Sequence, residues 1–220
     1  MDRLFLELLG DCGVLRTYET NEIIHLDQIP PESVYLIHEG KVKHLVYDEN
    51  GEEKTLLILK KGDIFGEVTY FQQDINAVVT QAISPCQIAS IPVAEFERML
   101  KEHPELYAEI VRLVTYKMRI VMSQVKDMAF QTVEGRLANL LLRLADQQGV
   151  QTEMGYVMID FDVTHQELAN MIAAYRSTVS RIMGRLCKHR VIEVVNKRIV
   201  ILDYLGLQQM ANSDCGNRQR

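Results

Sequence analysis

The sequence predicts an α+β protein with an antiparallel β domain over residues 1–102, a long helix over residues 103–130 and a C-terminal domain over residues 131–220. Short runs rich in valine, isoleucine, tyrosine and leucine, separated by turn residues, predict the β domain. Apolar residues at alternating steps of four and three predict the long helix. A capped helix, a tight turn, a basic helix and a small hairpin predict that the last domain is a winged helix-turn-helix.

The N-terminal residues are expected to form one short helix followed by strands. Residues 2–9 have a helical pattern, and Gly10 ends the helix. From about Thr17 to about Pro92, short apolar runs recur at regular spacing, which favours an antiparallel barrel or sandwich. The turn signals between these runs are Pro30-Pro31, Glu39-Gly40, Asn50-Gly51 and Lys61-Gly62-Asp63, of which Asn50-Gly51 is the clearest hairpin turn.

A narrow apolar seam runs along the predicted long helix, which begins near Pro104. A strict seam is typical of a two-stranded coiled coil, whereas a core-facing helix normally has a wider apolar stripe. We therefore expect this helix to form a homodimer interface, with packing on the chain's own β domain as the alternative. The seam consists of Tyr107, Val111, Val114, Met118, Val121, Val125 and Met128.

A helix, a loop and a strand are expected between the long helix and the helix-turn-helix, and a polar tail is expected at the C-terminus. Apolar residues at helical spacing after Gln131 predict another amphipathic helix. Residues 147–155 are expected to be a loop, and residues 156–161 a strand that leads into the helix-turn-helix. The tail after Gln208 is polar and is expected to fray.

Residues 164–186 have the pattern of two helices joined by a tight turn. Thr164 and Glu167 form a Ser/Thr-x-x-Glu capping box, and Ala173 with Ala174 takes the place of the turn. One face of the second helix carries guanidinium and hydroxyl groups without carboxylates, which suits phosphates and base edges in a DNA major groove. A solvated basic surface is the alternative. The proposed DNA-binding residues are Thr164, Arg176, Ser177, Ser180, Arg181, Arg185 and Lys197, the last at the Asn196-Lys197 turn of the hairpin.

The charge distribution supports DNA binding even though the net charge of the chain is −6. Residues 164–201 contain seven Lys and Arg and two acidic residues, a net +5, and residues 202–220 are neutral, so residues 1–163 carry −11. Positive charge is therefore confined to the region that would neutralise phosphates. A ligand-binding module without DNA contact is an alternative that this localised charge argues against.

The overall composition limits the other classes of protein. With 220 residues, of which 47% are hydrophobic, the chain can form two modest cores. No apolar run reaches membrane-spanning length and no signal peptide opens the sequence, so we expect a soluble, cytoplasmic protein without a membrane partner. The six histidines lack metal-ligand spacing, which argues against a cupin-like metalloenzyme. The four cysteines, Cys12, Cys86, Cys187 and Cys215, are scattered without a CxxC motif and are expected to be reduced thiols.

Four motifs resemble those of the CRP/FNR family of bacterial transcription regulators. They are GDIFGE at residues 62–67, DMAF at 127–130, GRL at 135–137 and RSTVSR at 176–181, and the resemblance covers almost the whole chain. The resemblance implies a jelly-roll effector domain, a dimerising helix and a winged helix-turn-helix, with no enzymatic activity. It also implies allosteric control of a homodimer that binds a palindromic operator in double-stranded DNA, with RNA polymerase as a further partner.

The residues expected to bind the effector match the cAMP-binding members of the family only in part. In those members a glycine and a glutamate contact the ribose, an Arg-Ser pair holds the cyclic phosphate, and a Thr-Ser pair on the long helix contacts adenine. Only the first pair is present here, and a phosphate without its guanidinium loses a charge-assisted hydrogen-bond partner. We expect a small, partly apolar effector without a phosphate, and not cAMP. The candidate effector-binding residues are Gly66, Glu67, Ile75, Asn76, Val121 and Met122.

The resemblance does not predict an iron–sulfur cluster or haem. The iron–sulfur members need an N-terminal cysteine cluster, and only Cys12 is present here. The haem-containing carbon monoxide sensors carry a histidine that would fall at Val68. The effector is therefore unknown, and two alternatives stay open: constitutive DNA binding, or a redox- or haem-responsive member of the same family.

The helix-turn-helix departs from the family pattern at three positions. Ser177 stands where many members have a glutamate, and serine discriminates less between bases. Ala173 stands where the turn usually has glycine. Tyr175 is a poor cap for the helix that follows.

Overall fold

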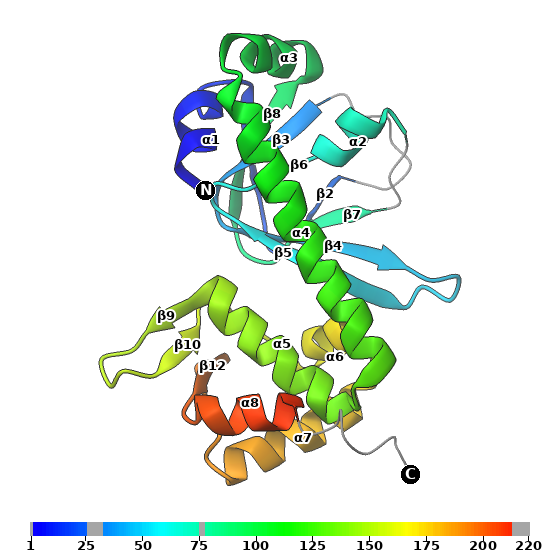
Figure 1. Cartoon of the computed structure of the whole chain (residues 1–220), viewed down its shortest axis with the longest axis vertical. Helices are drawn as coiled ribbons and strands as arrows, with labels where there is room; N and C mark the ends of the chain where they lie inside the picture. Colours follow the sequence, from blue (N-terminus) through cyan, green and yellow to red (C-terminus); the bar gives the residue numbers. More distant parts are fainter. Residues whose placement is uncertain (1, 26–32, 75–77, 213–220) are drawn as a thin grey trace. The chain divides into compact units, whose positions relative to one another are not determined.

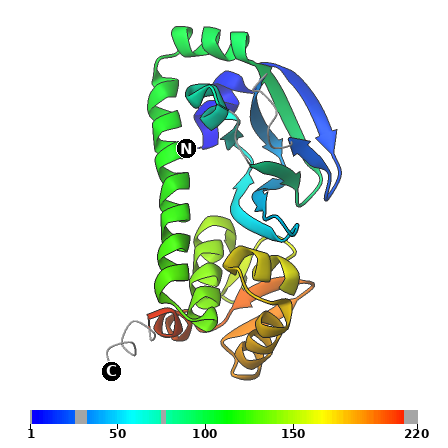
Figure 2. The same ribbon diagram turned by 90° about the vertical axis from the view of Figure 1, so that its right-hand side faces the viewer.

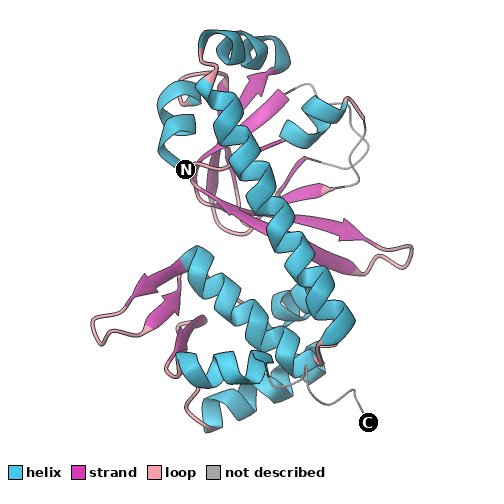
Figure 3. Cartoon of the chain, viewed as in Figure 1, coloured by secondary structure: helices cyan, strands magenta, loops and turns pink. Residues whose placement is uncertain are grey.

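The computed structural model describes residues 2–25, 33–74 and 78–212, and the chain divides into two units, Met1–Val121 and Met122–Arg220. The boundary falls within helix α4 (Glu105–Phe130), so each unit contains part of that helix. Strands dominate the first unit and helices the second (Figure 1, Figure 3).

The first unit is an antiparallel β sandwich with helices against it. Its elements are α1 (Asp2–Leu9), β1 (Val14–Tyr18), β2 (Ile23–His25), β3 (Ser33–Glu39), β4 (Lys41–Tyr47), β5 (Glu53–Lys60), β6 (Ile64–Phe65), α2 (Glu67–Gln72), β7 (Val79–Ala82), β8 (Cys86–Pro92), α3 (Val93–Glu102) and the first part of α4. The strand orders of its two four-stranded sheets are β1-β8-β3-β6 and β2-β7-β4-β5. One buried cluster combines Ile37 and Ile88 of the first sheet with Val42 and Leu57 of the second. The expected antiparallel β jelly-roll is thereby confirmed.

The turn signals lie between the strands, as expected. Gly40 joins β3 to β4 with φ +86°, and a Cβ atom there would lie 2.3 Å from the Pro85 carbonyl oxygen, so glycine is required. Gly51, with φ +79°, lies in the β4–β5 hairpin and confirms the Asn50-Gly51 turn. Pro30-Pro31 lies outside the described residues.

Helices α1, α3 and α4 contribute to a second core cluster of the first unit. Phe5, Phe96 and Leu106 come from these helices and meet Val34 of β3. Helix α3 was not expected, because the sequence analysis placed the first helix after the β domain near Pro104. The chain instead turns sharply between α3 and α4 (Figure 2), because the residue before a proline disfavours helical backbone angles.

Helix α4 has two apolar stripes, and only one of them packs on the first unit. Leu106, Ile110 and Leu113 are at most 3% exposed, and the same spacing continues to the buried Lys117. Val111 of the predicted seam is 64% exposed. The helix thus packs on the β domain mainly through a stripe other than the predicted seam, and most of the seam is left uncovered in the described part of this chain.

The second unit combines helices with a small antiparallel sheet. Besides the end of α4 it contains α5 (Val133–Gln148), β9 (Gly149–Gln151), β10 (Val157–Ile159), α6 (His165–Ile172), α7 (Arg176–Lys188), β11 (Ile192–Val195), β12 (Arg198–Ile201) and α8 (Tyr204–Asn212). The strand order is β11-β12-β10-β9. The predicted loop over residues 147–155 is wrong in part, because α5 extends through Gln148 and β9 pairs with β10.

Helix α8 was also missed by the sequence analysis. Its buried side chains are Leu207 and Ala211, which give a weak apolar pattern. The helix packs against α5, so the part of the polar tail through Asn212 is ordered by tertiary contact.

A buried carboxylate joins the end of α4 to α5 inside the second unit. Asp127 is 5% exposed. It accepts hydrogen bonds from Arg143 and, at 3.1 Å, from the Asn139 side-chain amide. Arg143 also donates to Ser123 at 3.2 Å. This network stabilises the corner between the two helices, because a buried charge needs several partners.

Candidate nucleic-acid interface and effector site

The capping box fixes the start of α6. The Thr164 backbone N–H donates to Glu167 Oε2 at 2.6 Å, and the Glu167 N–H donates to Thr164 Oγ1 at 3.1 Å. The Thr164 hydroxyl itself donates to the same carboxylate at 2.7 Å. Thr164 is exposed, but its hydroxyl already takes part in this local network. This occupied hydroxyl argues against Thr164 as a DNA-binding residue.

The turn between α6 and α7 shows both predicted departures from the usual pattern. Ala173 adopts the left-handed conformation with φ 50° and ψ 63°, which costs an alanine roughly 1–2 kcal/mol. Tyr175 occupies the N-cap of α7 without a side-chain hydrogen bond to the helix. The helix-turn-helix therefore forms in spite of a strained turn and a missing cap.

Helix α7 has one buried face and one polar face. Val179, Ile182, Met183 and Leu186 are at most 3% exposed and hold the helix in the second unit. Arg176, Ser177, Ser180 and Arg181 are exposed, and in the described part of the chain their side chains form no hydrogen bond or ion pair. This face can therefore meet an external partner.

Arg185 differs from the other polar residues of α7. Its Nη2 donates to Glu134 Oε2 at 2.5 Å, and Glu134 lies 51 positions earlier, in the first turn of α5. The sequence predicts a face free of carboxylates. That is correct along α7 but wrong in space, because the fold brings Glu134 beside Arg185.

The hairpin of β11 and β12 matches the predicted wing. Val195 pairs with Arg198 across a two-residue turn, and Asn196 and Lys197 have φ values of 48° and 65°. Positive φ at both positions is typical of a type I′ turn. The Lys197 carbonyl accepts a hydrogen bond from the Val163 N–H at 3.1 Å, while its side chain is exposed at the tip.

In the first unit, Glu67 is buried against a lysine that the sequence analysis did not select. Lys117 Nζ donates to Glu67 Oε1 and to the Ile64 carbonyl oxygen, both at 2.8 Å. The side chains of Lys117 and Glu67 are 8% and 1% exposed. The carboxylate offered for an effector thus already binds an ammonium group of the same chain.

The remaining candidate effector residues have different environments. Gly66 has φ +86°, and a Cβ atom there would lie 3.0 Å from the Ser33 carbonyl oxygen, so it permits a close backbone approach. Val121 packs partly against the cluster that contains Phe65. Met122 is 63% exposed, and Ile75 and Asn76 lie outside the described residues.

Two aromatic side chains contact Phe65, which follows Ile64 in β6. Phe65 stacks on Tyr35, with 4.8 Å between ring centroids and 9° between the planes. His44 meets the edge of the same Phe65 ring at 5.8 Å.

The predicted seam of α4 is exposed except at one position. Val121 is half-buried, whereas the other members are at least 37% exposed. These exposed members are Tyr107, Val111, Val114, Met118, Val125 and Met128.

The described cysteines are free thiols. Burial raises the pKa of Cys12, with a smaller contribution from Glu95, and burial likewise raises the pKa of Cys86 and of Cys187. Redox-active cysteines instead have a lowered pKa, so these three give no support to a redox sensor. Cys215 lies outside the described residues.

Over residues 2–25, 33–74 and 78–212, no three His, Cys, Asp or Glu side chains gather as metal ligands. No helix in these ranges is long and apolar enough to cross a membrane.

Comparison with known proteins identifies both units. Residues 15–103 match the cyclic nucleotide-binding domain, and residues 135–210 match the Crp-like helix-turn-helix domain. The cAMP-activated global transcriptional regulator CRP of Pasteurella multocida is 30% identical over 194 residues, which cover 88% of this chain and 91% of that protein. The chain belongs to the CRP/FNR family. As a CRP/FNR regulator it is a DNA-binding transcription factor with an effector-binding domain, and not an enzyme.

Other CRP/FNR proteins agree in sequence and fold. The global nitrogen regulator of Synechocystis sp. is 28% identical, over 89% of this chain and 88% of that protein. A CooA variant from Carboxydothermus hydrogenoformans has the same fold, with a TM-score of 0.80, 22% identity and coverage of 96% of this chain and 97% of that one.

Proposed function

We propose that this CRP/FNR protein is a homodimer that reads a palindromic operator through α7 and responds to a small effector in its first unit. The observation that carries the proposal is the exposed face of α7, where the side chains of Arg176, Ser177, Ser180 and Arg181 have no partner in the described part of the chain. The buried opposite face holds this helix rigidly, which direct reading of base edges needs.

Five residues of α7 and of the β11–β12 hairpin have proposed roles. Arg181 would bind a guanine through its guanidinium fork, with Ser177 and Ser180 on either side of it. Arg176 and Lys197 would bind phosphates, since Arg176 begins the helix and Lys197 lies at the tip of the wing. RNA polymerase is the further partner that the family resemblance implies, and a role on bacterial DNA would place the protein in the cytoplasm.

The exposed seam of α4 supports the dimer. Valine and methionine at positions that alternate by four and three leave a contiguous apolar strip, with Val111, Met118 and Val125 each more than half exposed. Exposed apolar strips of this regularity are typical of helix pairing in a coiled coil. Pairing would present two copies of α7, as a palindromic site requires.

Several observations bear on the effector. The Pasteurella relative is cAMP-activated, but the Synechocystis relative is a nitrogen regulator of nearly equal identity, so similarity does not select cAMP. The Glu67 carboxylate would have to exchange its Lys117 partner for an effector, or hold both. We propose a small, partly apolar effector without a phosphate. The same ion pair favours a second candidate, constitutive DNA binding, because Lys117 already provides the charge that Glu67 needs.

The role of α7 can be tested with two matched substitutions after selection of a preferred operator from random DNA. Arg181→Ala should cost about 1–3 kcal/mol per half-site and relax the preference at one base position. Lys197→Ala should weaken binding to all sequences alike. The slope of log affinity against log salt should fall by about one for each subunit that contacts DNA. If Arg181→Ala binds the selected operator with unchanged affinity and specificity, this role for Arg181 is wrong.

A further inference from the structure

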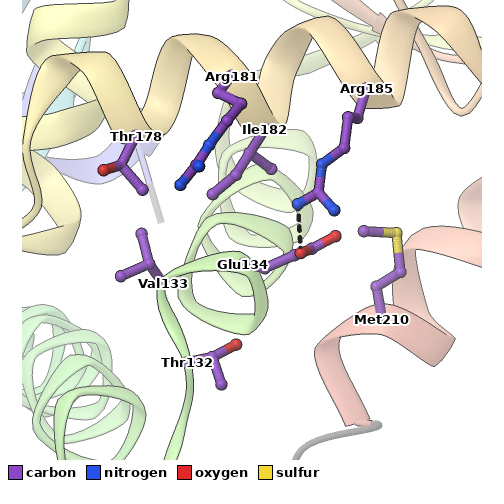
Figure 4. Close-up of a pocket in the computed structure, with 8 residues that line it drawn as sticks. All are labelled: Thr132, Val133, Glu134, Thr178, Arg181, Ile182, Arg185 and Met210. Atoms are coloured by element: carbon purple, nitrogen blue, oxygen red, sulfur yellow. Dashed lines mark hydrogen bonds and ion pairs between the residues drawn. The ribbon is translucent and has the colours of Figure 1, made fainter.

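A cavity of about 620 Å³ opens between the start of α5, helix α7 and helix α8 of the second unit (Figure 4). Arg181 and Arg185 line it from α7, Glu134 lines it from α5 and Met210 from α8. Glu134 and Arg185 point toward each other across this space and are joined by a hydrogen-bonded ion pair. The cavity thus places one carboxylate among the cations that are proposed to meet DNA.

Glu134 adds a negative charge to a surface on which α7 itself contributes only positive charges. Helix α7, Arg176–Lys188, contains no Asp or Glu, so its face taken alone is purely cationic. Arg185 lies four residues after Arg181, one helical turn further along the same side. Its ion pair with Glu134 leaves both side chains partly open to solvent, 54% and 38% exposed. The pair can therefore open without unfolding the unit.

We infer that Glu134 limits the affinity of this protein for DNA by competing with phosphates for Arg185. The inference rests on the proposed role of α7 in DNA binding. While Arg185 is paired with Glu134, its charge is neutralised and its fork is occupied, so it adds little to the attraction of any sequence. Because phosphate attraction is independent of sequence, Glu134 weakens binding to random DNA and to the operator alike.

The decisive variant is Glu134→Gln, which keeps the size of the side chain and removes its charge. For each subunit that contacts DNA, it should bind random DNA about five- to tenfold more tightly near 0.1 M salt, and the slope of log affinity against log salt should steepen by about one. Operator binding should gain by the same factor as random binding when Arg185 faces no base. Glu153→Gln is the matched control, because Glu153 is an exposed acid of the same unit, and it should stay within about twofold of the wild type.

Combination with Arg185→Gln separates competition for Arg185 from general repulsion. In the Arg185→Gln background, Glu134→Gln should have no further effect on affinity or on the salt slope. A wild-type slope for Glu134→Gln, or a gain that persists without Arg185, would overturn the inference while leaving DNA binding by α7 intact. If neither the wild type nor Glu134→Gln binds DNA at low salt, the proposed function fails and this inference with it. The unfolding midpoint of each variant distinguishes these effects from loss of the fold.

Discussion

The buried pair of Lys117 and Glu67 makes a sharp prediction about the first unit. Lys117→Met removes the ammonium group but keeps a flexible side chain of similar length, so the cavity left behind is small. The Glu67 carboxylate, whose side chain is 1% exposed, then loses its partner, and the Ile64 carbonyl oxygen loses a donor. Breaking a buried ion pair from one side costs about 3–5 kcal/mol. The midpoint of urea unfolding should therefore fall by about 2 M.

A second substitution tests the cause of this loss. Lys117→Met combined with Glu67→Leu removes both charges and should recover all but about 1–2 kcal/mol, the cost of the unpaired Ile64 carbonyl. Lys61→Met, an exposed lysine of the same unit, should change stability by less than about 0.5 kcal/mol. Hydrogen exchange at β6 should follow the loss and the recovery. If Lys117→Met is as stable as the wild type, or if Glu67→Leu brings no recovery, the ion pair does not have the role assigned to it.

Three other predictions follow from the turn, the seam and the effector site. Ala173→Gly should raise the free energy of unfolding by about 0.5–1 kcal/mol, because glycine adopts the left-handed conformation without steric cost. If chemical denaturation shows that this variant is less stable than the wild type, the strain assigned to Ala173 is wrong. Val125→Lys should give monomers in analytical ultracentrifugation, because two like charges would meet in the seam, whereas Val125→Ala should stay largely dimeric; a fully dimeric lysine variant would move the interface away from α4. Calorimetry with cAMP should show no specific heat of binding, and tight binding abolished by Glu67→Ala would reverse the conclusion about the effector.

Features that depend on neighbouring residues were predictable from the sequence. The capping box of Thr164, the Asn196-Lys197 turn and the buried stripe of α7 are local patterns, and the structure shows each of them. The weak N-cap at Tyr175 was predictable for the same reason. Local signals also located the hairpin turn at Gly51, because glycine adopts its positive φ without steric cost.

Features that depend on contacts between distant residues were not predictable in the same way. Lys117 lies 50 positions from Glu67, and Glu134 lies 51 positions from Arg185, so no spacing along the chain relates either pair. One signal was present for Lys117, since it interrupts an apolar stripe of α4 at a position where a buried residue is expected. Helix α8 was missed because its apolar face is small and its order comes from packing on α5.

We propose that two copies of α7, joined through α4, read DNA as a pair. Selection of bound sequences from random double-stranded DNA, followed by footprinting of the winner, tests it most directly. The dimer should recover two inverted half-sites with centres about 10 base pairs apart, one turn of the double helix. Recovery of a single asymmetric half-site, or no enrichment over random DNA at low salt, would contradict the claim.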